Sequence, residues 1–158
     1  QLADRLIKEM NVKVVFTGPS SDKELVNDIT RLMEMGSLNL AGKTSLKQLA
    51  ALIEKFDLFI SSDTGPMHIG PAMGTVTAGL FGPNTPVRYG PFGEGNLALY
   101  SPVSCSPCIN IHLAELKNCI KPICMEELST DEVFAAVSRK IQGLKENRRK
   151  NEYNKVLS

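Results

Sequence analysis

The chain has 158 residues, a length that fits one domain with a sizeable core. Hydrophobic residues make up 42% and charged residues 22%, and 18 Lys and Arg residues against 17 Asp and Glu residues give a formal net charge of +1. The balanced charge excludes a strongly basic nucleic-acid binder. The sequence also contains no apolar run of roughly 18–20 residues, which excludes an integral membrane protein. The first residues, QLADRLIKEM, do not resemble a signal peptide, so we expect a cytoplasmic protein.

The first part of the chain alternates amphipathic helices with short apolar runs. Helices are predicted at 2–10, from the capping box Ser21–Glu24 to Gly36, and from the capping box Ser45–Gln48 to Phe56. Strands are predicted at 12–16 and 38–40, each followed by glycine-containing turns. The helix after Ser21 is expected to turn Leu25, Val26, Ile29, Leu32 and Met33 inward.

The alternation continues in the second part. Strands are predicted at 58–60, 76–81 and 97–100, and helices at 66–73 and from the capping box Ser129–Glu132 onward. Residues 101–128 show little periodicity. The order predicts an α/β fold, a parallel sheet with helices on both faces. Because such a domain normally begins with a strand and this chain begins with a helix, we expect a fragment that lacks its first strand.

Ligands of open parallel sheets bind at the carboxyl ends of the strands, so the residues after 58–60 are the first candidates. Asp63, Thr64 and Gly65 precede a helix with Pro66 in its first turn. A glycine at a helix N-terminus suits an anion such as phosphate, with N–H donors expected from Thr64, Gly65 and Met67. The alternative is that Asp63 or Thr64 caps the helix.

Two further residues have competing interpretations. His68 lies about one turn into the same helix, as a site residue or a structural histidine. Glu24 is either a site residue or the last position of a capping box. The turn at 81–86 either covers a ligand or only reverses the chain.

The four cysteines, Cys105, Cys108, Cys119 and Cys124, have a loosely zinc-like spacing. In a reducing compartment we expect free thiols and no disulfide framework, with a metal site as the alternative. No Asp-x-Asp motif for a divalent metal is present.

A set of motifs resembles the signature of the bacterial heptosyltransferases, glycosyltransferase family 9. They are Asn39–Leu46 with Leu49-Ala50, Asp63–Ile69, Ala72–Gly74, Leu80–Pro83, Cys105–Cys108 and Cys124-Met125, within a resemblance that runs from residue 1 to about 142. The Asp63–His68 block is the most specific of them.

The resemblance implies an inverting, metal-independent enzyme of GT-B arrangement, with two Rossmann-like domains and no cofactor. Members transfer heptose from ADP-heptose to the inner core of lipopolysaccharide at the cytoplasmic side of the inner membrane. This chain is similar to the donor-binding C-terminal half, implying a domain at 1–145 and a basic tail at 146–158. We expect the acceptor site and catalytic base in an N-terminal half, no catalytic residue in this chain, and no activity from this chain alone.

The resemblance also implies roles for individual residues. Thr64 and Gly65 match positions that meet the diphosphate. Asp63 matches an acid that contacts the donor sugar or the neighbourhood of its phosphate, and His68 matches a recurrent position on the same helix. In the same way Glu24 matches an acid that binds the ribose, and Thr44 lies in the loop that flanks the adenine.

Other functions are compatible with the residues. The first alternative is another GT-B sugar-nucleotide transferase, because a heptose is not specified by these side chains. The second is a nucleotide-binding module without catalysis, and the third a zinc-binding domain. The basic segment 139–150, with Glu146 its one acid, is a solvated helix face or a peripheral contact with the inner membrane.

Overall fold

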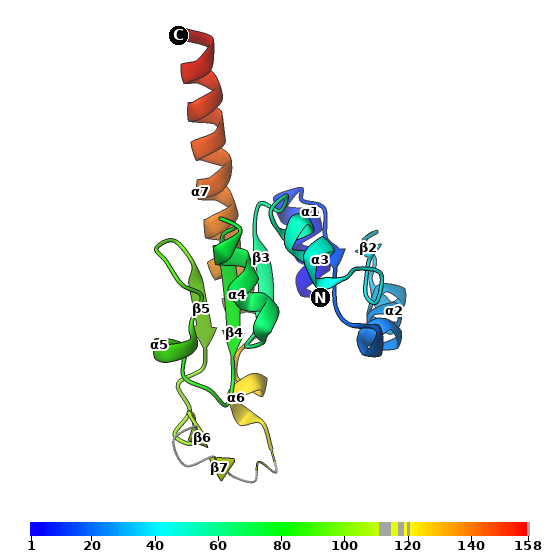
Figure 1. The fold of residues 1–158 in the computed structure, drawn as a ribbon, viewed down its shortest axis with the longest axis vertical. Helices are drawn as coiled ribbons and strands as arrows, with labels where there is room; N and C mark the ends of the chain where they lie inside the picture. Colours follow the sequence, from blue (N-terminus) through cyan, green and yellow to red (C-terminus); the bar gives the residue numbers. More distant parts are fainter. Residues whose placement is uncertain (111–114, 117–118, 120, 158) are drawn as a thin grey trace. The chain divides into compact units, whose positions relative to one another are not determined.

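The structure, a computed structural model, describes residues 1–110, 115–116, 119 and 121–157 (Figure 1). The chain divides into two compact units. The first unit combines Gln1–Leu52 with Phe134–Ser158, and the second consists of Ile53–Val133.

Helices dominate the first unit. Its elements are α1 (Leu2–Met10), β1 (Val15–Phe16), the 3₁₀ turn η1 (Ser20–Asp22), α2 (Lys23–Leu32), β2 (Leu38–Asn39), most of α3 (Leu46–Ile53) and most of α7 (Thr130–Leu157). Strands β1 and β2 pair in parallel, with Val15 opposite Leu38. Buried Leu6, Val26 and Ile141 contribute to the core, and the Arg5 guanidinium lies 4.0 Å from the centre of the Phe134 ring.

The second unit is built on a three-stranded parallel sheet. Its elements are β3 (Phe59–Ser62), α4 (Gly65–Ala72), β4 (Thr77–Phe81), α5 (Pro86–Tyr89), β5 (Leu97–Tyr100), β6 (Ile109–Asn110), β7 (Glu115–Leu116) and α6 (Ile123–Glu126). The strand order is β3-β4-β5, and β6 pairs with β7 in an antiparallel ribbon. β4 is central and almost wholly buried, as its sequence of small and apolar residues without a charged position predicts.

The five strands predicted from the sequence are all present, and all of their pairings are parallel. The prediction is too long at the first strand, where only Val15–Phe16 of the run 12–16 is a strand. Residues 101–128, which have little periodicity, hold the short elements β6, β7 and α6 that the sequence did not predict, and α5 was missed as well.

Two of the three predicted capping boxes form. At Ser45 the backbone N–H donates to Gln48 Oε1 at 2.9 Å, and the Gln48 N–H donates back to the Ser45 hydroxyl at 3.4 Å. The Ser129 and Glu132 pair repeats this pattern, and the hydrogen bonds from Ser129 hold the pKa of Glu132 below its usual value. The box predicted at Ser21 is wrong, because Ser21 lies within η1 and donates to Asp22 instead.

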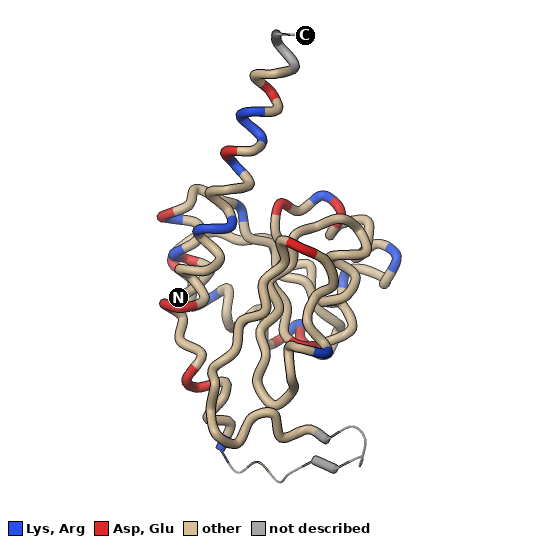
Figure 2. Tube along the Cα trace, turned by 90° about the vertical axis from the view of Figure 1, so that its left-hand side faces the viewer, with Lys and Arg blue, Asp and Glu red and all other residues tan. Residues whose placement is uncertain are grey.

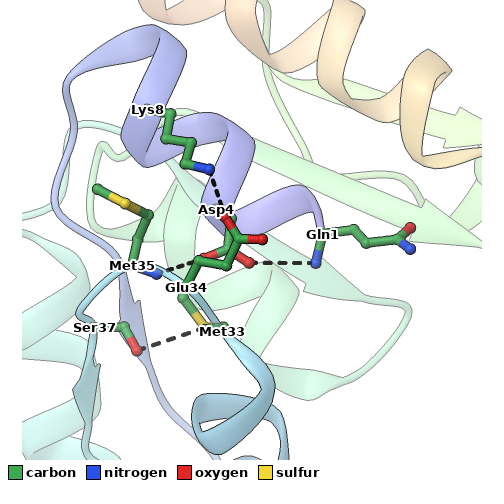
Figure 3. Close-up of polar contacts among 7 residues, drawn as sticks. All are labelled: Gln1, Asp4, Lys8, Met33, Glu34, Met35 and Ser37. Atoms are coloured by element: carbon green, nitrogen blue, oxygen red, sulfur yellow. Dashed lines mark hydrogen bonds and ion pairs between the residues drawn. The ribbon is translucent and has the colours of Figure 1, made fainter.

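α2 buries a narrower face than its sequence predicts. Val26 is buried, whereas Leu25 and Leu32 are 62% and 86% exposed. The segment after α2 is held from α1, as Figure 3 shows: Asp4 Oδ1 accepts the Met35 N–H at 2.9 Å, and Lys8 donates to Glu34 at 2.6 Å. The hydrogen bond to Glu34 raises the pKa of Lys8.

α7 changes character along its length. Val133, Phe134, Val137 and Ile141 are buried, and Lys145 donates a hydrogen bond to the Met10 carbonyl of α1. Every side chain from 146 to 154 is exposed. None of the helices in the part of the chain described is long and apolar enough to cross a membrane.

Candidate functional site

The N-terminus of α4 is uncapped by side chains. Thr64 is the N-cap residue in extended conformation, and neither it nor Asp63 makes a side-chain cap bond, so the capping alternative is wrong. The Met67 N–H donates to the Thr64 carbonyl at 3.0 Å, which corrects the expectation that Met67 is free to bind an anion. The Thr64 and Gly65 N–H groups have no acceptor among the residues described. Two donors therefore remain at the positive end of the helix dipole.

One face of α4 packs on the sheet and leaves the opposite face accessible. Gly70 lies against β4 so closely that an added Cβ would be 2.0 Å from Thr77 Oγ1, and the buried Met67 fills the space over Gly79. At Gly65 an added Cβ would meet nothing within 4 Å. His68, three residues on, is exposed on the same side as Gly65. The structure thus places His68 beside the helix N-terminus.

Asp63 follows β3 and is held by the loop that follows β4. Its N–H donates to the Leu80 carbonyl at 3.1 Å, and its Oδ2 accepts a hydrogen bond from Asn84 Nδ2 at 2.8 Å. Both side chains are half-buried. Sequence reasoning did not single out Asn84. The available signal was its place after a strand adjacent to β3, because neighbouring parallel strands end at the same edge.

The loop that carries Asn84 is held by hydrogen bonds from the segment that contains Cys105 and Cys108. The Ser106 hydroxyl donates to the Gly82 carbonyl at 2.7 Å, and the Cys108 N–H donates to the Pro83 carbonyl at 2.9 Å. Gly82 is packed tightly, since an added Cβ would be 2.5 Å from Met125 Sδ and 3.3 Å from Cys124 Sγ. The loop after β4 therefore has little freedom to move.

The cysteines are free thiols in the structure. Cys124 is buried, and burial, followed by the electrostatic effect of the neighbouring Cys108, raises the pKa of its thiol. Cys105 and Cys119 are exposed. Within the described ranges, no group of three or more His, Cys, Asp or Glu side chains is arranged to hold a metal ion.

In the first unit, Glu24 and Thr44 lie around the ends of β1 and β2. Glu24 is exposed in the first turn of α2, and Thr44 is half-buried in the loop after β2. That loop is fixed by the Gly42 N–H, which donates to the Gly18 carbonyl at 2.9 Å, and by the side chain of Asn39. Asn39 accepts from the Ala41 N–H and donates to Asn27 Oδ1 on α2, each at 2.9 Å.

This arrangement, with glycine-containing loops and a free helix N-terminus after parallel strands, agrees with the comparison of the sequence with known families. Residues 1–118 match the sequence model of the family Glycosyltransferase family 9 (heptosyltransferase). The chain belongs to glycosyltransferase family 9.

Similar proteins and solved structures agree with this assignment. The lipopolysaccharide core heptosyltransferase OpsX of Haemophilus influenzae is 44% identical over 86 residues, 53% of this chain and 25% of OpsX. The family 9 glycosyltransferase of Veillonella parvula superposes with a TM-score of 0.70 at 28% identity. The ADP-heptose lps heptosyltransferase II of Escherichia coli gives 0.73 at 22% identity, a likeness of fold.

Both solved structures confirm the predicted Rossmann-like α/β fold. Each superposition covers 90% of this chain and 40% of the solved chain. This family 9 chain therefore spans between a quarter and two fifths of the length of these relatives.

Proposed function

We propose that this chain forms the donor-binding domain of a GT-B glycosyltransferase that transfers heptose from ADP-heptose to the inner core of lipopolysaccharide. The proposal is supported by the family and by the similar proteins, which are heptosyltransferases of lipopolysaccharide and lipooligosaccharide. The observation that carries it is the pair of N–H groups at Thr64 and Gly65, which find no acceptor among the described residues, with open space around the Gly65 Cα.

The donor diphosphate is proposed to bind at the N-terminus of α4. As the glycosidic bond breaks, negative charge develops on the departing ADP, and fixed N–H donors and a helix dipole stabilise such charge. The Thr64 and Gly65 N–H groups fit this role, and the exposed His68 lies on the same side of the helix. Each charge-assisted hydrogen bond contributes about 1.5–3 kcal/mol.

The other proposed contacts follow the positions of the side chains. Asp63 has one carboxylate oxygen bound to Asn84, and its other oxygen is proposed to accept a hydrogen bond from the donor sugar. In the first unit, Glu24 is proposed to bind the ribose and Thr44 to flank the adenine. Both side chains have no hydrogen-bond partner in the ranges the structure describes, so they are free for a ligand.

Titration of ADP by calorimetry tests the proposed diphosphate position. Replacing Gly65 by Val puts a branched side chain where the structure is open, so the fold is kept but the approach of the diphosphate is blocked. We expect the Kd for ADP to rise at least about tenfold, or about 1.4 kcal/mol. The matched control is Gly36→Val, because Gly36 also has nothing within 4 Å of an added Cβ. Equal affinities of the wild type and Gly65→Val would refute the diphosphate position.

Replacing Asp63 distinguishes the binding of ADP from the transfer of the sugar. In the full-length protein, Asp63→Ala is expected to lower the rate of heptose transfer from ADP-heptose more than it lowers the affinity for ADP, because the carboxylate is assigned to the sugar. A protein that binds ADP but transfers nothing would favour a nucleotide-binding module. Binding of UDP in preference to ADP would favour another sugar-nucleotide transferase.

We also propose that the exposed end of α7 contacts an anionic membrane surface. Figure 2 shows Lys and Arg recurring along the last turns of this helix. Of the basic residues of 139–150, Arg148, Arg149 and Lys150 lie in the exposed turns, whereas Lys145 is half-buried and donates a hydrogen bond to Met10. Near an anionic surface each basic residue of the exposed turns adds about 1 kcal/mol of attraction. This contact would hold the enzyme close to a lipid-linked acceptor.

Sedimentation with phosphatidylglycerol vesicles tests the membrane contact. The double variant Arg149→Glu with Lys150→Glu is expected to bind at least about tenfold more weakly, since four units of charge are changed. The control, Lys47→Glu with Lys55→Glu, changes net charge equally at exposed positions on or just after α3. Equal loss of binding in both variants, or none in either, would exclude a specific role for α7.

A further inference from the structure

Asn84 makes hydrogen bonds with both ends of its side-chain amide. Nδ2 donates to Asp63 Oδ2 at 2.8 Å, and Oδ1 accepts the Thr85 N–H at 3.0 Å. The reversed amide would set two acceptors against each other at Asp63 and two donors at Thr85, so these partners fix the orientation of the amide. The nitrogen of Asn84 is therefore committed to the carboxylate.

The backbone on both sides of this hydrogen bond is fixed. Asp63 is joined to β4 through its N–H bond to Leu80. The loop before Asn84 receives hydrogen bonds at the Gly82 and Pro83 carbonyls, and Gly82 is closely covered by Met125. A donor on so restrained a loop holds its acceptor in one rotamer with little further loss of conformational entropy.

We propose that Asn84 is a positioning residue for the transfer reaction, which holds Oδ2 of Asp63 so that Oδ1 is presented to a hydroxyl group of the donor sugar. The inference rests on the function proposed for Asp63. Oδ1 has no partner among the residues that the structure describes, so it is available as an acceptor. Asn84 acts through Asp63 alone and does not touch the diphosphate.

A double-mutant cycle on the full-length protein tests this role. Transfer from ADP-heptose is measured for the wild type, Asn84→Ala, Asp63→Ala and the double variant. We expect Asn84→Ala to lower kcat/KM about tenfold, because a carboxylate that is free to rotate is productively placed for a fraction of the time. In the Asp63→Ala background the same change is expected to have less than about a twofold effect. The affinity for ADP should stay within about twofold in all four proteins.

Two further substitutions at Asn84 distinguish a positioning role from a general loss of structure. Asn84→Asp keeps the size of the side chain but replaces the donor with an acceptor, so like charges oppose each other at Asp63. We expect Asn84→Asp to lower kcat/KM at least as much as Asn84→Ala does, whereas Asn84→Ser, which retains a donor, recovers part of the rate. Thermal unfolding of each variant confirms that it is folded.

The outcomes separate this inference from the proposed function. An effect of Asn84→Ala that is equally large in the presence and absence of the Asp63 carboxylate would overturn the positioning role. The positioning role would also be overturned if Asn84→Ala and Asn84→Asp both kept the wild-type kcat/KM while Asp63→Ala had a lower kcat/KM. If Asp63→Ala itself transfers heptose at the wild-type rate, the role proposed for Asp63 fails first, and that of Asn84 with it.

Discussion

The loops that follow the strands of the two units hold their polar side chains in different ways. In the second unit, the Asp63 carboxylate is bound by Asn84, and α4 is fixed on β4 by the close approach of Gly70 to Thr77. In the first unit, the backbone of the loops is fixed at Gly42 and Asn39, but Glu24 and Thr44 have no hydrogen-bond partner in the described ranges.

This difference fits the roles proposed above, with Asp63 near the donor sugar and Glu24 and Thr44 near the nucleoside. Groups that meet the part of a ligand where bonds break must be held in advance, because reorganisation during the reaction raises the barrier. Groups that only recognise a nucleoside are able to adopt their final rotamers on binding, at a modest entropic penalty. We therefore expect substitutions in the contact between α4 and β4 to lower the stability strongly, and substitutions in the loop at Gly42 to lower it less.

The largest effect is expected from filling the contact between α4 and β4. Gly70→Ala puts a methyl group 2.0 Å from the hydroxyl of the fully buried Thr77. We expect the free energy of unfolding to fall by about 2–3 kcal/mol, measured by urea denaturation. On the same helix Gly65→Ala faces open space and should change stability by less than about 0.5 kcal/mol. Similar losses in the two variants would show that α4 is not fixed through Gly70.

A smaller effect is expected at the loop of the first unit. Gly42 has φ +71°, and an added Cβ would lie 3.0 Å from Ser20 Cα. Gly42→Ala is expected to lower the free energy of unfolding by about 1–2 kcal/mol, because the left-handed conformation is strained for alanine. Gly36→Ala, where space is open and φ is not positive, serves as the control in the same denaturation experiment. A loss in Gly42→Ala that exceeds the loss in Gly70→Ala would reverse the comparison.

The sequence predicted most of this fold because the signals were local. Val76–Phe81 contains small and apolar residues and no charged side chain, and its strand is the buried centre of a sheet. Ser45 and Ser129 cap their helices as their spacing predicts. The inward face of α2 was predicted too wide, because helical periodicity does not say how many apolar positions find a partner: Leu32 finds none and is 86% exposed.

The candidate site was predicted in part for the same reason. Asp63, Thr64 and Gly65 form one contiguous motif at a strand end, and the structure places them at an uncapped helix N-terminus. Asn84 is 21 residues from its partner Asp63, and no local pattern connects the two. That the Met67 N–H is already used depends on the extended conformation of Thr64, which the sequence does not specify.

The contrast within α7 has a consequence for how this helix forms. Starting a helix is unfavourable, because several residues must be ordered before hydrogen bonds compensate, whereas extending an existing helix is easy. The buried stretch from Val133 to Ile141 supplies that start, and the exposed turns beyond Lys145 elongate from it without tertiary packing of their own. The basic end of α7 is thus helical because it extends a helix that the core has already started. It stays helical only while the buried half of α7 remains in place.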